Sequence, residues 1–278
     1  MNAALHTLVG SDLSECQNDL PIADKVDIAR EFGVASATYE QASRLQRLMG
    51  NAMIAELSRA GFQGERALDV GCGTGWFTRA LAGMASVGRV TGVDLSAGMV
   101  ERARNTVTGD VSWLVADAEH LPLPDDSVDL IFSNLMIQWC SDPVPVLLEC
   151  RRLLRPGGRL MLSTLMDGTL NELKKAWEVA DPGRPHVNRF EPEHRLRELV
   201  TQALPGAQFV RRTIALPYES PLALTGELKQ LGAGFKGDAR RKTLTGPGRV
   251  RAMCKAYPRQ PDGSVAASYE AAWVYWQA

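Results

Sequence analysis

Three glycines at alternate positions separate a short apolar run from a helical pattern. The turn reads Gly71-Cys72-Gly73-Thr74-Gly75 and is preceded by Asp69. Glycines allow a sharp turn and let a ligand sit against backbone N–H groups at a helix N-terminus. The spacing differs from the G-x-G-x-x-G of dinucleotide sites, and Asp69 suits an ammonium group better than phosphates. We therefore expect Asp69, Gly71, Gly73 and Gly75 to bind a nucleoside-type ligand, with a purely structural turn as the alternative.

Two more acidic residues close the next two expected strands. Asp94 ends the second strand, where a carboxylate can accept both hydroxyls of a ribose. Asp117 ends the third strand and, together with Ala118, can meet the amino group and edge of an adenine. Each acid alone is more often a solvated loop residue. Because three acids stand at strand ends around one glycine turn, we add Asp94, Leu95, Asp117 and Ala118 to the expected ligand site.

Polar and aromatic residues follow the fourth expected strand. Open α/β sheets bind their ligands beyond the carboxyl ends of the strands. Ser133 is therefore a candidate for the nucleoside-type ligand, and Asn134, Gln138 and Trp139 are candidates for an acceptor pocket, with ordinary packing at a helix start as the alternative. Tyr39, in an earlier helical stretch, is a candidate to close over the ligand with its hydroxyl, although a packed helix tyrosine explains it equally well.

The elements that must position these residues alternate between strands and helices. Helical spacing covers 24–60, 96–104 and 143–154, and apolar runs cover 66–70, 89–93, 112–116, 128–133 and 159–164, the last after a turn at 155–158. Such alternation predicts a parallel sheet with helices on both faces. Further helices are expected at 170–179, 191–203 and 222–231, and further strands at 208–218 and 266–277.

We expect one domain over 24–278, preceded by a flexible leader at 1–23. Within the domain, the cofactor-binding core covers 65–165 and acceptor-side helices and loops cover 166–255.

The composition is that of an ordinary globular protein, with 45% apolar and 23% charged residues. No apolar run approaches the ~20 residues of a membrane span, and the first residues lack the pattern of a signal peptide. The five cysteines show no metal-ligand spacing, so reduced thiols in a cytoplasmic protein are expected.

The net charge of −1 divides unevenly along the chain. Residues 1–150 carry 10 basic and 20 acidic residues, a net of −10, and residues 151–278 carry 21 and 12, a net of +9. The basic half either faces an acidic partner or substrate, or the two halves neutralise each other across the fold.

The residues around the glycine turn resemble those of class I methyltransferases. The stretch 68–75 reads Leu-Asp-Val-Gly-Cys-Gly-Thr-Gly, the acid Asp94 and the pair Asp117-Ala118 follow, and 154–158 reads Leu-Arg-Pro-Gly-Gly. The resemblance implies an α/β Rossmann-like fold with a seven-stranded, mostly parallel sheet, helices on both faces and a small helical cap. It also implies S-adenosylmethionine as methyl donor, with S-adenosylhomocysteine as product.

A narrower resemblance covers most of the chain. The segments 32–40, 133–140, 168–173, 186–190 and 228–233 are similar to the malonyl-acyl-carrier-protein O-methyltransferases of biotin synthesis. That family methylates the free carboxylate of a malonyl thioester. The methyl ester masks the negative charge, so that fatty-acid synthesis can extend the acyl chain toward a pimeloyl precursor. The resemblance places His186 and Lys229 with the acceptor pocket.

A carboxylate acceptor simplifies the chemistry. Its pKa of about 4 leaves it ionised at neutral pH, so no general base is needed and catalysis rests on alignment and exclusion of water. Moving it into a dry pocket is costly unless a cation meets it, and a bidentate arginine is the natural partner. Arg189 and Tyr39 are therefore the candidate catalytic residues, with a surface loop arginine as the alternative for Arg189. His186 and His194 have no metal-ligand spacing, and no metal is expected.

Acyl carrier proteins are acidic, so the basic half offers them a docking surface, for which the candidates are Arg211, Arg212, Arg240, Arg241 and Lys242. Two other functions stay open: methylation of another acceptor, such as a quinone ring or a small metabolite, and a non-catalytic protein that kept the fold. Nucleic-acid methylation is disfavoured, because Ser133-Asn134-Leu135-Met136 stands where an Asn-Pro-Pro-aromatic signature is expected. Neither nucleic acid nor a membrane is an expected partner.

Overall fold

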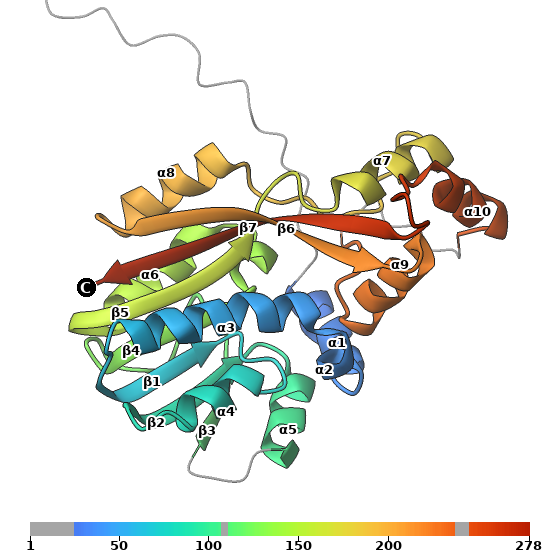
Figure 1. Cartoon of the computed structure of the whole chain (residues 1–278). Helices are drawn as coiled ribbons and strands as arrows, with labels where there is room; N and C mark the ends of the chain where they lie inside the picture. The colour runs from blue at the N-terminus through green and yellow to red at the C-terminus, as the bar shows by residue number, and fades with distance from the viewer. Residues whose placement is uncertain (1–24, 107–110, 237–244) are drawn as a thin grey trace, which may run out of the picture.

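Seven strands form one sheet (Figure 1). The strands are β1 Gly64–Val70, β2 Val87–Asp94, β3 Val111–Val115, β4 Val128–Asn134, β5 Leu154–Leu165, β6 Gln208–Tyr218 and β7 Val265–Gln277. Their order is β3-β2-β1-β4-β5-β7-β6, and β7 runs antiparallel to the other six strands. The predicted seven-stranded, mostly parallel sheet is thereby confirmed.

The computed structural model describes residues 25–106, 111–236 and 245–278, so the expected leader at 1–23 lies outside the described residues. The helices are α1 Lys25–Ala35, α2 Tyr39–Ala42, α3 Arg44–Arg59, α4 Trp76–Ala82, α5 Ala97–Thr106, α6 Pro143–Leu153, α7 Asn171–Ala180, α8 Glu193–Ala203, α9 Pro221–Gln230 and α10 Pro247–Ala256, with a 3-10 turn at Ile137–Trp139. No helix within these ranges is both long and apolar enough to cross a membrane. Nor do three His, Cys, Asp or Glu side chains within them group to hold a metal ion.

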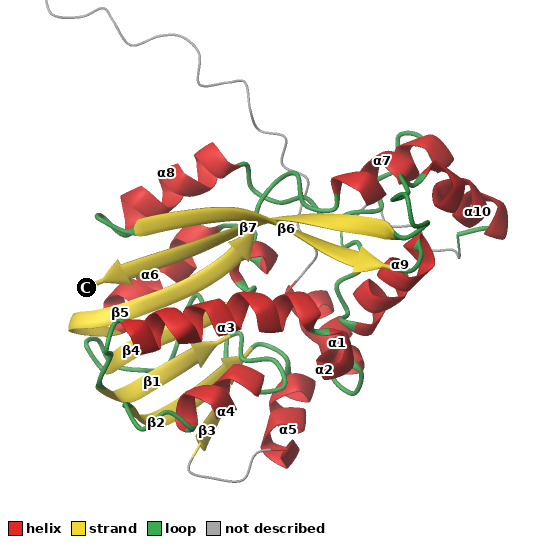
Figure 2. Ribbon diagram, in the orientation of Figure 1, coloured by secondary structure: helices red, strands yellow, loops and turns green. Residues whose placement is uncertain are grey.

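Helices cover both faces of the sheet because side chains of a strand point alternately to opposite faces. In β4, Phe132 belongs to the hydrophobic cluster that α3 and α4 cover, whereas the adjacent Ile131 belongs to the cluster that α6 and α8 cover. In β5, Met161 belongs to the cluster under α3 and α4, and the adjacent Leu160 belongs to the cluster under α6 and α8. Figure 2 shows the three layers that result.

A cap lies beyond one end of the parallel strands and consists of α1, α2, α7, α9 and α10 (Figure 1). Within the cap, segments far apart in the sequence are in contact. The hydroxyl of Thr38 donates to the backbone carbonyl of Gln230 at 2.9 Å, and the guanidinium of Arg44 pairs with Glu227 at 3.0 Å. Helix α7 packs against α10. This is the small helical cap that the resemblance implies.

Three local predictions need correction. The single helix expected at 24–60 is broken into α1, α2 and α3, because the hydroxyls of Thr38 and Ser43 donate to the carbonyls of Ala35 and Glu40 and so compete with helix formation. The turn expected at 155–158 lies inside β5, since pairing to β4 jumps from Leu154 to Arg159 and the intervening residues bulge out. Helix α10 has no predicted counterpart among the expected helices.

The packing of β2 against β3 predicts a stability effect at Gly92. A methyl group at Gly92 would lie 2.5 Å from the ring of Trp113, so we expect Gly92→Ala to lower the free energy of unfolding by about 1–3 kcal/mol. Gly226 in α9 is the matched control, because a methyl group there meets no atom within 4 Å and alanine favours a helix by roughly 1 kcal/mol. Urea unfolding of both variants measures the difference. Equal effects would contradict this account of the β2–β3 packing.

Candidate functional site

The glycine turn lines a pocket beyond the carboxyl ends of β1, β2 and β4, which we call the glycine-loop pocket. The space between its lining residues, with the open mouth included, is about 830 Å³. Gly71 and Gly73 line it and have φ angles of +76° and +54°, which favour glycine. Gly75 also has a positive φ, but it lies against the ring of Trp113 and does not line the pocket.

Asp94 ties the turns after β1 and β2 together. One of its carboxylate oxygens accepts the backbone N–H of Gly73 and the other that of Ser96, both at 2.8 Å. Burial raises the pKa of Asp94, while these two hydrogen bonds oppose the rise. Asp94 and Leu95 both line the glycine-loop pocket, and each carboxylate oxygen keeps a second lone pair for a ligand hydroxyl. The residues present therefore fit the ribose of the expected methyl donor.

Asp117 and Ala118 line the same pocket, together with Lys25, a residue that sequence reasoning did not find. The ammonium of Lys25 in α1 lies 2.7 Å from the carboxylates of Asp117 and of Glu119. Burial acts to raise the pKa of Asp117, but the Lys25 ammonium holds that pKa below its usual value. Lys25 stands 92 positions before Asp117, so no local pattern connects the two.

Three aromatic side chains separate the glycine-loop pocket from a second pocket. Phe32, Tyr39 and Trp139, with Leu135, line both pockets. The ring of Phe32 meets Trp139 edge-on with centroids 5.1 Å apart and Tyr39 with centroids 6.4 Å apart. Burial, and next the carboxylate of Asp94, raises the pKa of Tyr39 above its usual value. Tyr39 therefore stays protonated and keeps a hydroxyl that can donate where the two pockets meet.

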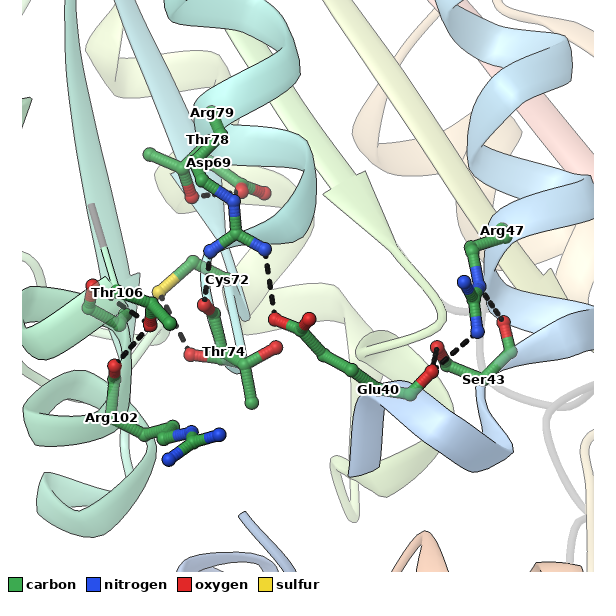
Figure 3. A network of polar contacts seen from close by, with 12 residues as sticks. Glu40, Ser43, Arg47, Asp69, Cys72, Thr74, Thr78, Arg79, Arg102 and Thr106 are labelled. Carbon is green, nitrogen blue, oxygen red and sulfur yellow. Dashed lines mark hydrogen bonds and ion pairs between the residues drawn. The ribbon is translucent and has the colours of Figure 1, made fainter. Parts of the chain in front are cut away.

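An ion pair holds Tyr39 in this place. The carboxylate of Glu40, the next residue in α2, accepts from Arg79 at 2.8 Å, and Arg79 also donates to the backbone carbonyl of Thr74 at 3.0 Å. Arg47 donates to the backbone carbonyl of Glu40. Figure 3 shows Arg79 reaching from α4 to both Glu40 and Thr74. The network connects α2 to the glycine turn, and it involves residues that sequence reasoning did not single out.

The second pocket lies under the cap and we call it the cap pocket. The space between its lining residues, with the open mouth included, is about 790 Å³. Gln138, Trp139 and His186 line it, and Asn134 lines the glycine-loop pocket. That these four residues receive an acceptor stays a prediction. No lysine or arginine from the part of the chain that the structure describes lines the cap pocket.

His186 is held in an ordered position. Its ring stacks on Trp177 with centroids 3.9 Å apart, and its Nε2 lies 2.9 Å from a carboxylate oxygen of Asp181. Asn188, two residues later, donates to the carbonyls of Ala233 and Gly234. These contacts fix the loop that carries the predicted acceptor residues to the end of α9.

Two predicted acceptor residues lie elsewhere. Arg189 is exposed and lines neither pocket, although Asn188 and Phe190 beside it line the cap pocket. Lys229 is exposed and lines a third pocket next to the cap pocket. Their roles toward the acceptor stay predictions.

Two predicted ligand residues lie behind the glycine-loop pocket rather than in its lining. Asp69 is 2% exposed and accepts the hydroxyl of Thr78 at 2.6 Å (Figure 3). Ser133 donates to the carbonyl of Val70 at 2.8 Å, which fixes the end of β1 against β4. A direct ligand contact of either residue stays a prediction; in this structure both support the turn.

The chain is similar to known methyltransferases along most of its length. A family model described as a methyltransferase domain matches residues 68–162. The biotin biosynthesis bifunctional protein BioHC of Cellvibrio japonicus is 42% identical over 89% of this chain, which spans 49% of that protein. The malonyl-acyl-carrier-protein O-methyltransferase of Hahella chejuensis is 38% identical over 91% of this chain and 90% of its own length. The crystal structure of YcgJ from Bacillus subtilis shares the fold, with a TM-score of 0.57 at 20% identity, and the match covers 81% of this chain and 97% of that one.

The buried Asp69 predicts a pH dependence of stability. Burial raises its pKa to about 7 in the folded protein, against the opposing hydrogen bond from Thr78, whereas an unfolded aspartate titrates near 4. The folded state therefore holds a proton that the unfolded state releases, and stability falls as the pH rises from about 4 to 7 and then levels off.

We expect Asp69→Asn, which can still accept from Thr78, to remove this fall. Its stability relative to the native chain should rise by roughly 1–4 kcal/mol between pH 5 and pH 8. Urea unfolding at several pH values measures the effect. A constant difference between the two proteins would show that Asp69 is ionised throughout.

Proposed function

The chain belongs to the malonyl-acyl-carrier-protein O-methyltransferases, and on that premise we propose that it methylates the free carboxylate of malonyl-acyl carrier protein. The product is the malonyl methyl ester that starts pimeloyl and biotin synthesis. The observation that carries the proposal is the extent of the similarity: the methyltransferase model ends at residue 162, whereas the relatives match about nine-tenths of the chain. The matched region therefore includes the cap, which forms the pocket for the acceptor.

When bound, S-adenosylmethionine supplies an electrophilic methyl group on a sulfonium. For this donor we assign Asp94 to the ribose hydroxyls, and Asp117 with Ala118 to the adenine edge. The backbone at Gly71 and Gly73 lies where the amino-acid part of the donor can approach closely, since both glycines line the glycine-loop pocket. Lys25 closes the adenine end through its ion pair with Asp117.

The acceptor reacts where the two pockets meet. A carboxylate is already ionised at neutral pH, so the protein needs to align it and exclude water rather than remove a proton. Phe32 and Trp139 exclude water from this junction, and the protonated hydroxyl of Tyr39 can donate to the carboxylate. The Glu40–Arg79 pair keeps Tyr39 in position, with an N–O distance of 2.8 Å.

The carrier protein is the proposed partner, docking on the basic C-terminal half. Of the docking candidates, Arg211 pairs with Glu193 at 2.7 Å, and Arg240, Arg241 and Lys242 lie outside the described residues.

Methyl transfer from labelled S-adenosylmethionine tests the function. We expect base-labile label on malonyl-carrier protein and none on acetyl-carrier protein, because the acetyl group lacks a free carboxylate. Scintillation counting before and after mild base measures the ester. A protein that binds S-adenosylhomocysteine but labels neither carrier would refute the acceptor and leave the donor site standing.

Arg189 gives a second test. The cap pocket has no cation in its described lining, and burying an unpaired carboxylate is costly. We therefore propose that the Arg189 side chain turns inward to meet the substrate, and expect Arg189→Ala to raise the KM for malonyl-carrier protein about tenfold or more. Arg195→Ala, at an exposed position in α8, is the control. An unchanged KM would leave the carboxylate to Tyr39, Gln138 and His186.

A further inference from the structure

A third pocket continues the cap pocket toward the surface, and we call it the outer pocket. The space between its lining residues, with the open mouth included, is about 1020 Å³. The two pockets share Leu173, His186, Leu228, Gly234 and Phe235 as lining residues. The cap pocket in turn shares Phe32, Tyr39, Leu135 and Trp139 with the glycine-loop pocket. The three pockets therefore adjoin in series, from the proposed donor site to the surface under the cap.

The charges along this series are unevenly placed. The described lining of the cap pocket holds no lysine or arginine, whereas Arg184 and Lys229 line the outer pocket and are exposed. Neither side chain forms an ion pair within the described residues. Glu31 also lines the outer pocket, but the ammonium of Lys236 pairs with it. The outer pocket therefore presents two cations that pair with no carboxylate among the described residues.

An extended ligand with an anionic far end fits this distribution. The proposed substrate is a malonyl thioester on a carrier protein, and its reacting carboxylate must reach the junction at Tyr39 and Trp139. The thioester then lies in the cap pocket, and the arm that joins it to the carrier must leave the protein. The outer pocket adjoins the cap pocket on the side away from the donor site, so it offers that route.

We propose that the outer pocket binds the phosphopantetheine arm of the carrier protein, with Arg184 and Lys229 holding its phosphate. The proposal rests on the proposed function, whose acceptor it describes further. Trp177, Leu173 and Phe235 form the apolar wall along which the neutral part of the arm lies. Arg211 and Arg212, the described residues that sequence analysis offered for docking, line none of the three pockets. The arm therefore enters under the cap and not at β6.

Two small substrates that differ only in the phosphate test this assignment. Malonyl-phosphopantetheine and malonyl-pantetheine are compared as acceptors by kcat/KM with saturating S-adenosylmethionine. We expect the native chain to prefer the phosphorylated substrate about tenfold, since two exposed cations each contribute modestly to binding an anion. In Arg184→Gln/Lys229→Gln the preference should fall close to one, and the kcat/KM for malonyl-carrier protein should fall by a similar factor.

The double variant Arg66→Gln/Arg89→Gln is the matched control. It removes the same charge at two exposed positions that pair across β1 and β2 and line none of the pockets, so the preference should stay about tenfold. If Arg184→Gln/Lys229→Gln is too unstable to assay, Lys229→Gln alone should lower the preference about threefold.

Three results would overturn the assignment. One is a native chain that methylates both small substrates equally well. Another is a preference that survives in Arg184→Gln/Lys229→Gln. The third is a variant that loses efficiency on malonyl-carrier protein alone, which would place the two cations against the protein surface of the carrier. If the native chain methylates malonyl-carrier protein but gives any of these results, the proposed function stands and only the assignment of the arm fails. If the native chain is inactive on malonyl-carrier protein, both proposals fail.

Discussion

The buried carboxylate of Asp94 is the interaction on which the geometry of the site depends. It accepts backbone N–H groups from Gly73 and from Ser96, both at 2.8 Å, and so fixes the turns after β1 and β2 to each other. Burying a charge is costly, and these two donors offset part of that cost while its remaining lone pairs are available to a ligand. Behind it, Asp69 and Thr78 hold the first turn of α4 to the end of β1. The carboxylate that orders the two loops thus also lines the glycine-loop pocket.

The pockets are lined by the cap as well as by the sheet. The sheet supplies the glycine turn and Asp94, but the wall between the glycine-loop pocket and the cap pocket comes from Phe32 and Tyr39 of the N-terminal segment and Trp139 after β4. The Glu40–Arg79 pair is one-third exposed or less on each side, so it contributes modestly to stability. The pair also connects α2, which begins at Tyr39, to α4 and the glycine turn.

The distribution of charge matches a reaction that neutralises an anion and a cation. Little new charge develops in the transition state of such a reaction, so an acceptor pocket with few charged groups is suitable. The carboxylate of the acceptor still needs a hydrogen-bond donor or a cation there, because burying it alone is costly. The cations gather instead at the two ends of the series of pockets, Lys25 at the donor end and Arg184 and Lys229 at the outer end. The net charge of +9 on residues 151–278 includes both cations of the outer pocket.

Local patterns in the chain suffice to predict the strands of the core, the glycine turn and the acids that close β2 and β3, since apolar runs and turn residues act over a few positions. They do not predict that Asp69 and Ser133 lie behind the pocket, that Arg189 points to solvent, or that a helix of 24–60 breaks where Thr38 and Ser43 bond to the backbone. Lys25 meets Asp117 across 92 positions, and Phe32 meets Trp139 across a similar separation. Such contacts form only in the folded chain. Which residues line a pocket depends on the distances between segments that are far apart in the sequence, and the local spacing of residues does not encode those distances.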